Sequence, residues 1–375
     1  DENTGVKEIP VQYTRKQIFE FAESELLAIE NELKAPGTNE YGRVDRVAGW
    51  FLLARMYLNA QTWINENKYQ EAYTYATKVI ADGHYPLASD YREIFLADNN
   101  TCKEIIWPLV QDGLRAQSSA GTNFYVKAFV NGPMDELYKT GVGSRGWGNV
   151  RAKVSLVDAF DADDVMFDGN DTWGNNKKDK RAQFMTALPN QVKDTWDVNM
   201  DMTSTFTCGY GYIKWRNVTK EDELSASGDA YTSIDFPLFR TADAYLMAAE
   251  AILRGASGTQ SEALGYVNEV RTRAYMSGKY AKSGVRSDVS GEIGANELDL
   301  DFLLLERQKE LASELIRRTD LIRFGKYTKG NNWDWKNGVR LGEDVDDKYN
   351  LFPIPESELT NNPTLVQNDG YKVIK

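Results

Sequence analysis

The chain has 375 residues, a formal net charge of −12 and 42% hydrophobic residues. The acidic balance argues against a nucleic-acid partner, because no basic stripe is present to neutralise phosphates, and no run of about 18 apolar residues is present to span a membrane. The single histidine, His84, excludes a multi-histidine zinc site, while Cys102 and Cys208 are compatible with two buried thiols or with one disulfide.

The first part of the chain, residues 1–110, predicts a helical scaffold, because apolar residues recur there at helical spacing. The helices expected from this spacing cover residues 13–34, 45–60 and 68–81. The third helix is predicted to end at Asp82-Gly83, since glycine favours the backbone conformation that closes a helix. The chain starts at Asp1 without a charged-then-apolar leader, so we expect that it was trimmed at its front.

A pattern from the second and third helices returns near residue 242. The segments "ARMYLNA" (54–60) and "ADAYLMA" (242–248) share A-x-x-Y-L-x-A, and each is followed by E-A-x-x-Y-x-x-x-V, starting at Glu71 and at Glu262. Small residues allow two helices to approach closely, which is typical of tetratricopeptide hairpins. We therefore predict two such hairpins. The alternative is a chance similarity of alanine-rich helices.

The middle of the chain, residues 111–235, differs from the scaffold in composition. It is rich in Gly, Asn, Asp and Trp, with short apolar runs such as "NFYVKAFV" and "YGYIKW". The whole chain contains 9 Trp, 20 Tyr and 15 Phe, and many of these rings fall in such loop-like stretches. Loops held on a rigid scaffold are where binding residues concentrate. This segment therefore predicts a loop-rich face that binds a ligand.

The last part, residues 236–375, returns to helical patterns. "FPLFRTADAYLMAAEAIL" (236–253) predicts a thin helix that packs against its hairpin partner and the next repeat, and 300–324 predicts one long amphipathic helix. The residues Arg317, Arg318, Asp320 and Arg323 at helical spacing predict an ion-paired framework. The tail, residues 331–375, predicts a loop-rich wrap. The expected fold is mainly α, with a large loop-rich insertion and minor β structure.

Several longer stretches carry a resemblance to a known family. They include "IDFPLFRTADAYLMAAEAI", "ERQKELASELIRRTDLIRFG", "NLFPIPESEL" and "QNDGY". With these motifs the chain resembles the SusD/RagB family, the outer-membrane glycan-binding lipoproteins of Bacteroidetes, and above all its starch-binding members. The matching stretches run through nearly the whole chain.

This resemblance implies a superhelix of tetratricopeptide hairpins with a variable loop-rich face, forming one domain overall. It also implies a protein that is not an enzyme but captures oligosaccharide at the cell surface, as a lid on a SusC-like TonB-dependent outer-membrane transporter. Family members are anchored by a lipidated N-terminal cysteine. Because the matching begins at the equivalent of the middle of the helical scaffold, we expect the first repeats and the lipid anchor to lie outside this chain.

The candidate glycan-binding residues centre on "GVGSRGWGNVRA" (141–152). Trp147 lies between glycines, with Arg145, Asn149 and Arg151 close by in sequence. A flat ring can stack on the apolar face of a sugar, while amides and guanidinium groups bind its hydroxyls. By position, Trp147 resembles a stacking tryptophan of the starch-binding members. The alternative is a tryptophan packed on its own loop.

A second stacking position of the starch-binding members does not carry over, because Ser119 stands where they have a tyrosine. Asn123 and Tyr125 follow in the same stretch, and the Tyr125 ring could compensate for the missing one. The lesser candidates Trp173 and Trp196 have polar neighbours, but half-buried loop anchors are an equal interpretation. "WDWKNG" (333–338) recurs in the family irrespective of ligand, so we interpret it as structural.

The sequence contains no clear motif for binding a metal or a cofactor, so none is predicted. The acidic stretch "FDADDVMFDGNDTWGNN" does not match a calcium loop. "LADNN" near Asp98 and the loop at Asp235 could meet around a calcium ion, with solvated loops as the alternative. Two rival functions stay open: a glycoside hydrolase that uses two of the 56 acidic residues, and a RagB-type scaffold that binds peptide in its groove.

Overall fold

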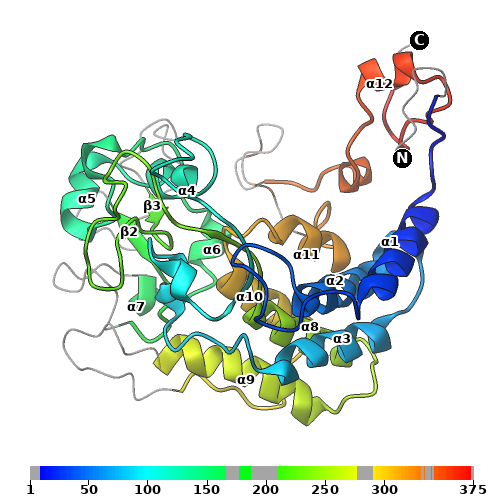
Figure 1. Cartoon of the computed structure of the whole chain (residues 1–375), viewed down its shortest axis with the longest axis horizontal. Coiled ribbons are helices and arrows are strands. Elements are labelled where there is room, and N and C mark those ends of the chain that lie inside the picture. The colour runs from blue at the N-terminus through cyan, green and yellow to red at the C-terminus, as the bar shows by residue number, and fades with distance from the viewer. Residues whose placement is uncertain are drawn as a thin grey trace. The chain divides into compact units, whose positions relative to one another are not determined.

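The computed structural model describes residues 9–165, 177–186, 209–276, 290–330, 333, 339 and 342–372. Helices dominate the described part, as predicted (Figure 1). The chain divides into two compact units. Unit 1 consists of Asp1–Ala28, Asn59–Asn67 and Arg318–Lys375, and unit 2 of Ile29–Leu58 and Lys68–Arg317. Among the described helices, none combines the length and the apolarity that a membrane crossing requires.

The first three helices lie close to their predicted positions. They are α1 (Arg15–Ile29), α2 (Arg46–Ile64) and α3 (Tyr69–Asp82). Gly83 follows α3 with a φ of 78°, so the helix ends as the sequence predicts, in a conformation that glycine adopts without strain. The later long helices are α8 (Thr241–Leu253), α9 (Gln260–Met276) and α10 (Leu300–Leu311).

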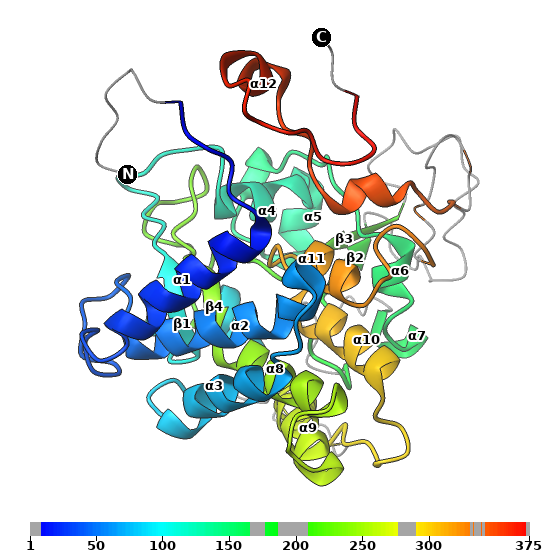
Figure 2. The same cartoon turned by 90° about the vertical axis from the view of Figure 1, so that its right-hand side faces the viewer.

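The two predicted hairpins are neighbours in unit 2, although about 190 residues separate them in the sequence. Helix α8 packs against both α3 and α9, and it also contacts α10 (Figure 2). Ala242 and Ala249 of α8 are buried in one apolar cluster with Val267 of α9 and Leu303 of α10. The small alanine side chains therefore allow α8 to pack closely against several helices at once.

The predicted helix over 236–253 is wrong in its first five residues. These residues form the strand β4 (Phe236–Arg240), which pairs antiparallel with β1 (Ile105–Leu109). The Phe239 ring stacks on the ring of Phe51 with centroids 4.6 Å apart. Aromatic residues on a half-buried surface favour strand over helix, and Pro237 has no N–H to donate within a helix.

The predicted helix over 300–324 is also interrupted. Helix α10 ends at Leu311 and α11 (Arg317–Arg323) begins six residues later. Between them Ser313 and Leu315 have positive φ angles of 61° and 62°. The break allows the Ala312 carbonyl to accept a hydrogen bond of 2.7 Å from the Lys214 ammonium. A buried charge here thus outweighs helix propensity.

The predicted framework around α11 exists, but ion pairing makes only part of it. Arg323 and Asp320 form the predicted pair, at 2.8 Å. Arg318 instead donates to the backbone carbonyls of Tyr349 and Asn350, each at 3.0 Å. In unit 2, Arg317 donates to the Leu304 carbonyl.

Short elements make up the loop-rich middle of unit 2. The helices are α4 (Thr122–Ala128), α5 (Gly132–Tyr138), α6 (Val154–Val157) and α7 (Ala162–Val165), with the 3-10 turn η3 (Gly143–Arg145); the 3-10 turns η1 (Tyr91–Phe95) and η2 (Asn99–Thr101) precede this segment. Strands β2 (Phe184–Thr186) and β3 (Tyr210–Tyr212) pair antiparallel. In the same apolar cluster as these strands, the Trp215 ring stacks on Phe236, with centroids 5.6 Å apart and planes 9° from parallel. The segment whose composition is typical of loops therefore packs around an ordered core of aromatic rings.

The described tail in unit 1 contains little regular structure, as predicted. It includes η6 (Asp347–Asn350) and α12 (Glu356–Asn361). The Trp333 indole N–H donates to the Tyr327 carbonyl at 2.8 Å, which agrees with a structural role for the first residue of "WDWKNG". The rest of that motif lies outside the described residues.

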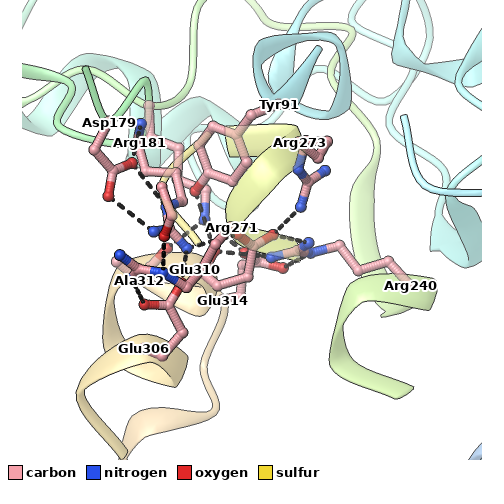
Figure 3. A network of polar contacts seen from close by, with 12 residues as sticks. Tyr91, Asp179, Arg181, Arg240, Arg271, Arg273, Glu306, Glu310, Ala312 and Glu314 are labelled. Carbon is pink, nitrogen blue, oxygen red and sulfur yellow. Dashed lines mark hydrogen bonds and ion pairs between the residues drawn. The ribbon is translucent and has the colours of Figure 1, made fainter. Parts of the chain in front are cut away.

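A buried network of opposite charges joins β4, α9 and α10 to the middle segment (Figure 3). Arg240, at the end of β4, binds the carboxylates of Glu104 at 2.8 Å, Glu310 at 2.6 Å and Glu314 at 2.7 Å. Arg181 binds Glu310 as well, at 3.2 Å. The cations of the network are Arg181, Lys214, Arg240, Arg271 and Arg273, and its carboxylates are Glu104, Asp179, Glu306, Glu310 and Glu314. Buried charges persist only when paired in this way.

Candidate functional site

The Trp147 loop follows η3 and is fixed to the C-terminal end of α4 by its backbone. The N–H groups of Trp147, Gly148 and Asn149 each donate at 2.8 Å, to the carbonyls of Lys127, Val130 and Ala128 respectively. The indole side chain is not buried beneath these contacts, since 36% of Trp147 is exposed. A rigid backbone therefore presents an exposed flat ring, which costs little conformational entropy when a ligand binds.

Two glycines permit this close contact between the Trp147 loop and α4. A Cβ at Gly146 would lie 2.4 Å from the Val130 carbonyl oxygen, so another residue would force the backbones apart. Gly148 has a φ of 58°, a conformation that side chains with a Cβ rarely adopt. The glycine-rich sequence around Trp147 is thus explained by the geometry of its loop.

Phe124 on α4 lies beside Trp147, and sequence reasoning missed it. The two ring centroids are 6.1 Å apart with planes at 59°, and 43% of Phe124 is exposed. Its neighbour Tyr125, the predicted candidate, is half-buried and stacks on the Trp215 ring with centroids 5.3 Å apart. Adjacent residues on a helix point about 100° apart, and here Phe124 faces solvent while Tyr125 faces the aromatic core. The sequence gives no signal for which one does.

Arg145 adds a charged group to the same surface. Its Nε lies 3.1 Å from a carboxylate oxygen of Asp229, and both side chains are largely open to solvent. Below them, Lys127 is buried and its ammonium donates to the Ala230 carbonyl. Burial and the nearby Arg145 lower the pKa of Lys127, while Asp229 acts in the opposite direction. The three charged groups therefore form one local cluster.

The remaining candidates occupy different environments. Asn149 is exposed on the Trp147 loop, and Arg151 is half-buried further along it. Ser119 is exposed in the loop before α4. Asn123 is buried, and its amide donates to the Ser118 carbonyl at 3.0 Å, so it is not on the exposed surface with Trp147.

The loops near Asp98 and Asp235 meet through hydrogen bonds. The side chain of Asn99 both donates to the Asp235 carbonyl, at 2.8 Å, and accepts from its N–H, at 2.9 Å. The Asp235 carboxylate accepts from the Gln111 N–H at 2.7 Å and from the Tyr41 hydroxyl. Burial raises the pKa of Asp235. Within the described ranges, no group of three or more His, Cys, Asp or Glu side chains is arranged to hold a metal.

Some predicted residues have no role in this surface or lie outside the description. Cys102 is a free thiol, and burial raises its pKa to about 12. His84 is exposed, and its Nδ1 lies 2.9 Å from a carboxylate oxygen of Asp82. Cys208, Trp173 and Trp196 lie outside the described residues.

The comparisons with known proteins agree with this architecture. The chain is 32% identical to the starch-binding protein SusD of Bacteroides thetaiotaomicron over 97% of its own length and 67% of that protein's. It is 25% identical to the SusD-like protein P25 of Formosa agariphila, covering 88% of this chain and 59% of that protein.

Solved structures show the same fold. A surface glycan-binding protein A from Bacteroides thetaiotaomicron, in complex with laminarihexaose, matches with a TM-score of 0.66 and 22% identity, covering 96% of this chain and 72% of that one. A SusD-like protein from Bacteroides fragilis matches with a TM-score of 0.65 and 20% identity, at the same coverage. The model of the SusD family itself matches residues 103–371. The chain therefore belongs to the SusD family.

Proposed function

We propose that this protein binds a neutral oligosaccharide, of starch-like or related glucan type, without cutting it. The surface that binds it is formed by Trp147 and Phe124, with Arg145 and Asn149 at its edge. The observation that carries this proposal is the exposed Trp147 ring on a loop fixed by its backbone. The two tilted rings offer flat apolar faces to successive sugar units, and the polar side chains offer donors for their hydroxyls.

The relatives support a sugar as the ligand. One of them is a starch-binding protein, and the structure of another contains laminarihexaose. Tyr125 contributes indirectly, because its ring contacts the Phe124 ring, with centroids 6.0 Å apart, and stacks on the buried Trp215 ring. Ser119 lies in the loop before α4 and is exposed, so we keep it as a further contact for a longer chain.

Replacing Trp147 by Ala tests the proposal. Loss of one stacking contact of about 1.4 kcal/mol corresponds to about tenfold weaker binding. We expect this loss for maltohexaose or laminarihexaose, measured by isothermal titration calorimetry. Trp63→Ala is the matched control, because Trp63 is exposed to 37% and belongs to α2 in unit 1. Equal affinities of wild type and Trp147→Ala would contradict the proposed surface.

The same preparation separates binding from catalysis. We expect no reducing ends to appear when the protein is incubated with the bound glucan. Sustained release of reducing ends would favour the glycoside hydrolase. Retained peptide binding in Trp147→Ala, without any sugar binding in wild type, would favour the peptide scaffold.

We also infer that the bound sugar is delivered to a TonB-dependent transporter at the outer membrane, with the protein held there by a lipid anchor. Membership of the SusD family supports this inference. Cross-linking of the full-length protein in cells, followed by identification of the linked partner, tests it. We expect a TonB-dependent transporter as the main product, and recovery of the protein from the soluble fraction alone would oppose it.

A further inference from the structure

We infer that Asp229 determines the specificity of this surface, by making it select neutral oligosaccharides over anionic ones. This inference rests on the proposed function. Its basis is the pairing of Asp229 with Arg145, which precedes Trp147 by two residues in the candidate surface. The exposed cation of the surface is thus already matched by a carboxylate before any ligand arrives.

The pair is built into the fold of the loop. Gly143, at the start of η3, has a φ of 53°, and a Cβ there would lie 2.8 Å from a carboxylate oxygen of Asp229. The carboxylate therefore lies directly against the backbone of the turn that carries Arg145. A side chain at position 143 would displace the Asp229 carboxylate, so the glycine leaves room for the ion pair.

The neighbouring cations are less accessible than Arg145. Lys127 is buried, and its ammonium donates to the Ala230 carbonyl. Arg151 is half-buried and has interactions of its own. A ligand that approaches Trp147 therefore meets a positive group whose charge Asp229 offsets, together with the exposed carboxylate itself.

A charged sugar has little to gain at such a surface. Its carboxylate would be repelled by Asp229 at short range, and the net charge of −12 adds a weaker repulsion that salt screens. A neutral sugar has no such cost, because the remaining N–H groups of Arg145 donate to hydroxyls while the Asp229 pair persists. The surface is therefore organised for uncharged ligands.

The experiment compares one glucan in two forms, the neutral oligosaccharide and the same oligosaccharide bearing carboxymethyl groups. The measured quantity is the ratio of the Kd for the charged form to the Kd for the neutral form, at low salt. Wild type should give a ratio well above one. Asp229→Asn should lower this ratio about fivefold, because Arg145 can then form an exposed ion pair with the carboxylate of the charged ligand. A concentration of 0.5 M NaCl should remove most of this change in the ratio, because salt screens exposed charges.

A matched control distinguishes a local effect from one of net charge. Glu40→Gln removes a carboxylate from another exposed pair, with Arg43 at 3.1 Å, and should leave the ratio unchanged. If Asp229→Asn does not fold, as judged by circular dichroism, Arg145→Ala tests the same inference, because it exposes an unpaired Asp229 and should raise the ratio.

The outcomes separate this inference from the proposed function. If wild type binds neither form, the proposed function fails. If wild type binds the neutral glucan but the ratio is the same in Asp229→Asn, the role of Asp229 is wrong while the glycan surface stands. A wild-type preference for the charged form also overturns the inference.

Discussion

Gly146 lies directly before Trp147 and controls how closely its loop approaches α4. A Cβ at this position would be 2.4 Å from the Val130 carbonyl oxygen, a backbone atom that cannot move like a flexible side chain. We expect Gly146→Ala to lower the free energy of unfolding by about 1–3 kcal/mol, as overpacking does. It should also weaken glucan binding, since the Trp147 ring shifts with its loop. Urea denaturation and calorimetry measure the two effects.

Gly265→Ala is the control for that substitution. Gly265 lies within α9, and a Cβ there would meet nothing within 4 Å. Alanine in an open helical position stabilises by up to about 1 kcal/mol relative to glycine. The same chemical change is thus expected to act with opposite signs at the two positions. If both variants were stabilised, the contact between the Trp147 loop and α4 would be looser than described.

At the scale of single residues, composition and neighbours predicted the exposure of Trp147, but not which residues lie around it. A tryptophan between glycines has few ways to be covered by its own chain, and 36% of it is exposed. Asn123, Phe124 and Tyr125 are consecutive, and which of them faces outward depends on how α4 is rotated against Trp215. Asp229 lies 84 residues from Arg145, so no local pattern could have paired them.

Helix α8 tests the packing of whole elements, because it contacts α3, α9 and α10. Ala249 is buried among residues of these neighbours, including Val270 of α9. We expect Ala249→Leu to lower the free energy of unfolding by about 1–3 kcal/mol, since the added carbons have no space. Ala81→Leu is the control, because Ala81 is exposed near the end of α3. Equal stability of the two variants in urea would contradict the close packing of α8.

The helices could be predicted from sequence where one apolar face repeats, as in α1, α2 and α3. The errors lie where a distant residue decides the conformation. The pairing of β4 with β1 joins segments about 130 residues apart, and the break after α10 depends on Lys214. Local propensity carries no information about such partners. The start of α8 at residue 241 and the end of α10 at residue 311 could therefore not be predicted from the periodicity of apolar residues alone.

At the scale of the whole molecule, the residues that identify the family differ from those proposed to bind its ligand. Glu306 and Glu310 of the "ERQKEL" motif, and Arg240 of "FPLFR", belong to the buried charge network (Figure 3). Arg307 of the same motif pairs with Asp243 at 2.8 Å. The recognisable signature thus encodes the framework. The residues proposed to bind the ligand form none of these ion pairs, so the family could be recognised when the ligand could not.

The network also sets the behaviour of the fold in acid. Burial alone would raise the pKa of Glu310, but Arg273, Arg240 and Arg181 together lower it to about 2, from an ordinary value of 4.5. Between these values the unfolded chain binds a proton that the folded protein does not. Stability is therefore fully present above pH 4.5 and falls as the pH drops towards 2. Asp243, with a pKa lowered to about 2 despite its burial, acts in the same direction.

Glu310→Gln should change both the level and the slope of this stability curve. Removing this carboxylate leaves the buried guanidinium groups of Arg181, Arg240 and Arg273 with one ionic partner fewer, which costs about 3–5 kcal/mol at neutral pH. The decline between pH 4.5 and 2 should be shallower than in wild type, since Glu310 no longer takes up a proton, and Asp243 should account for much of what persists. Urea denaturation across this range measures both effects, with Glu71→Gln on the exposed side of α3 as the control. An unchanged slope in Glu310→Gln would show that other carboxylates govern acid unfolding.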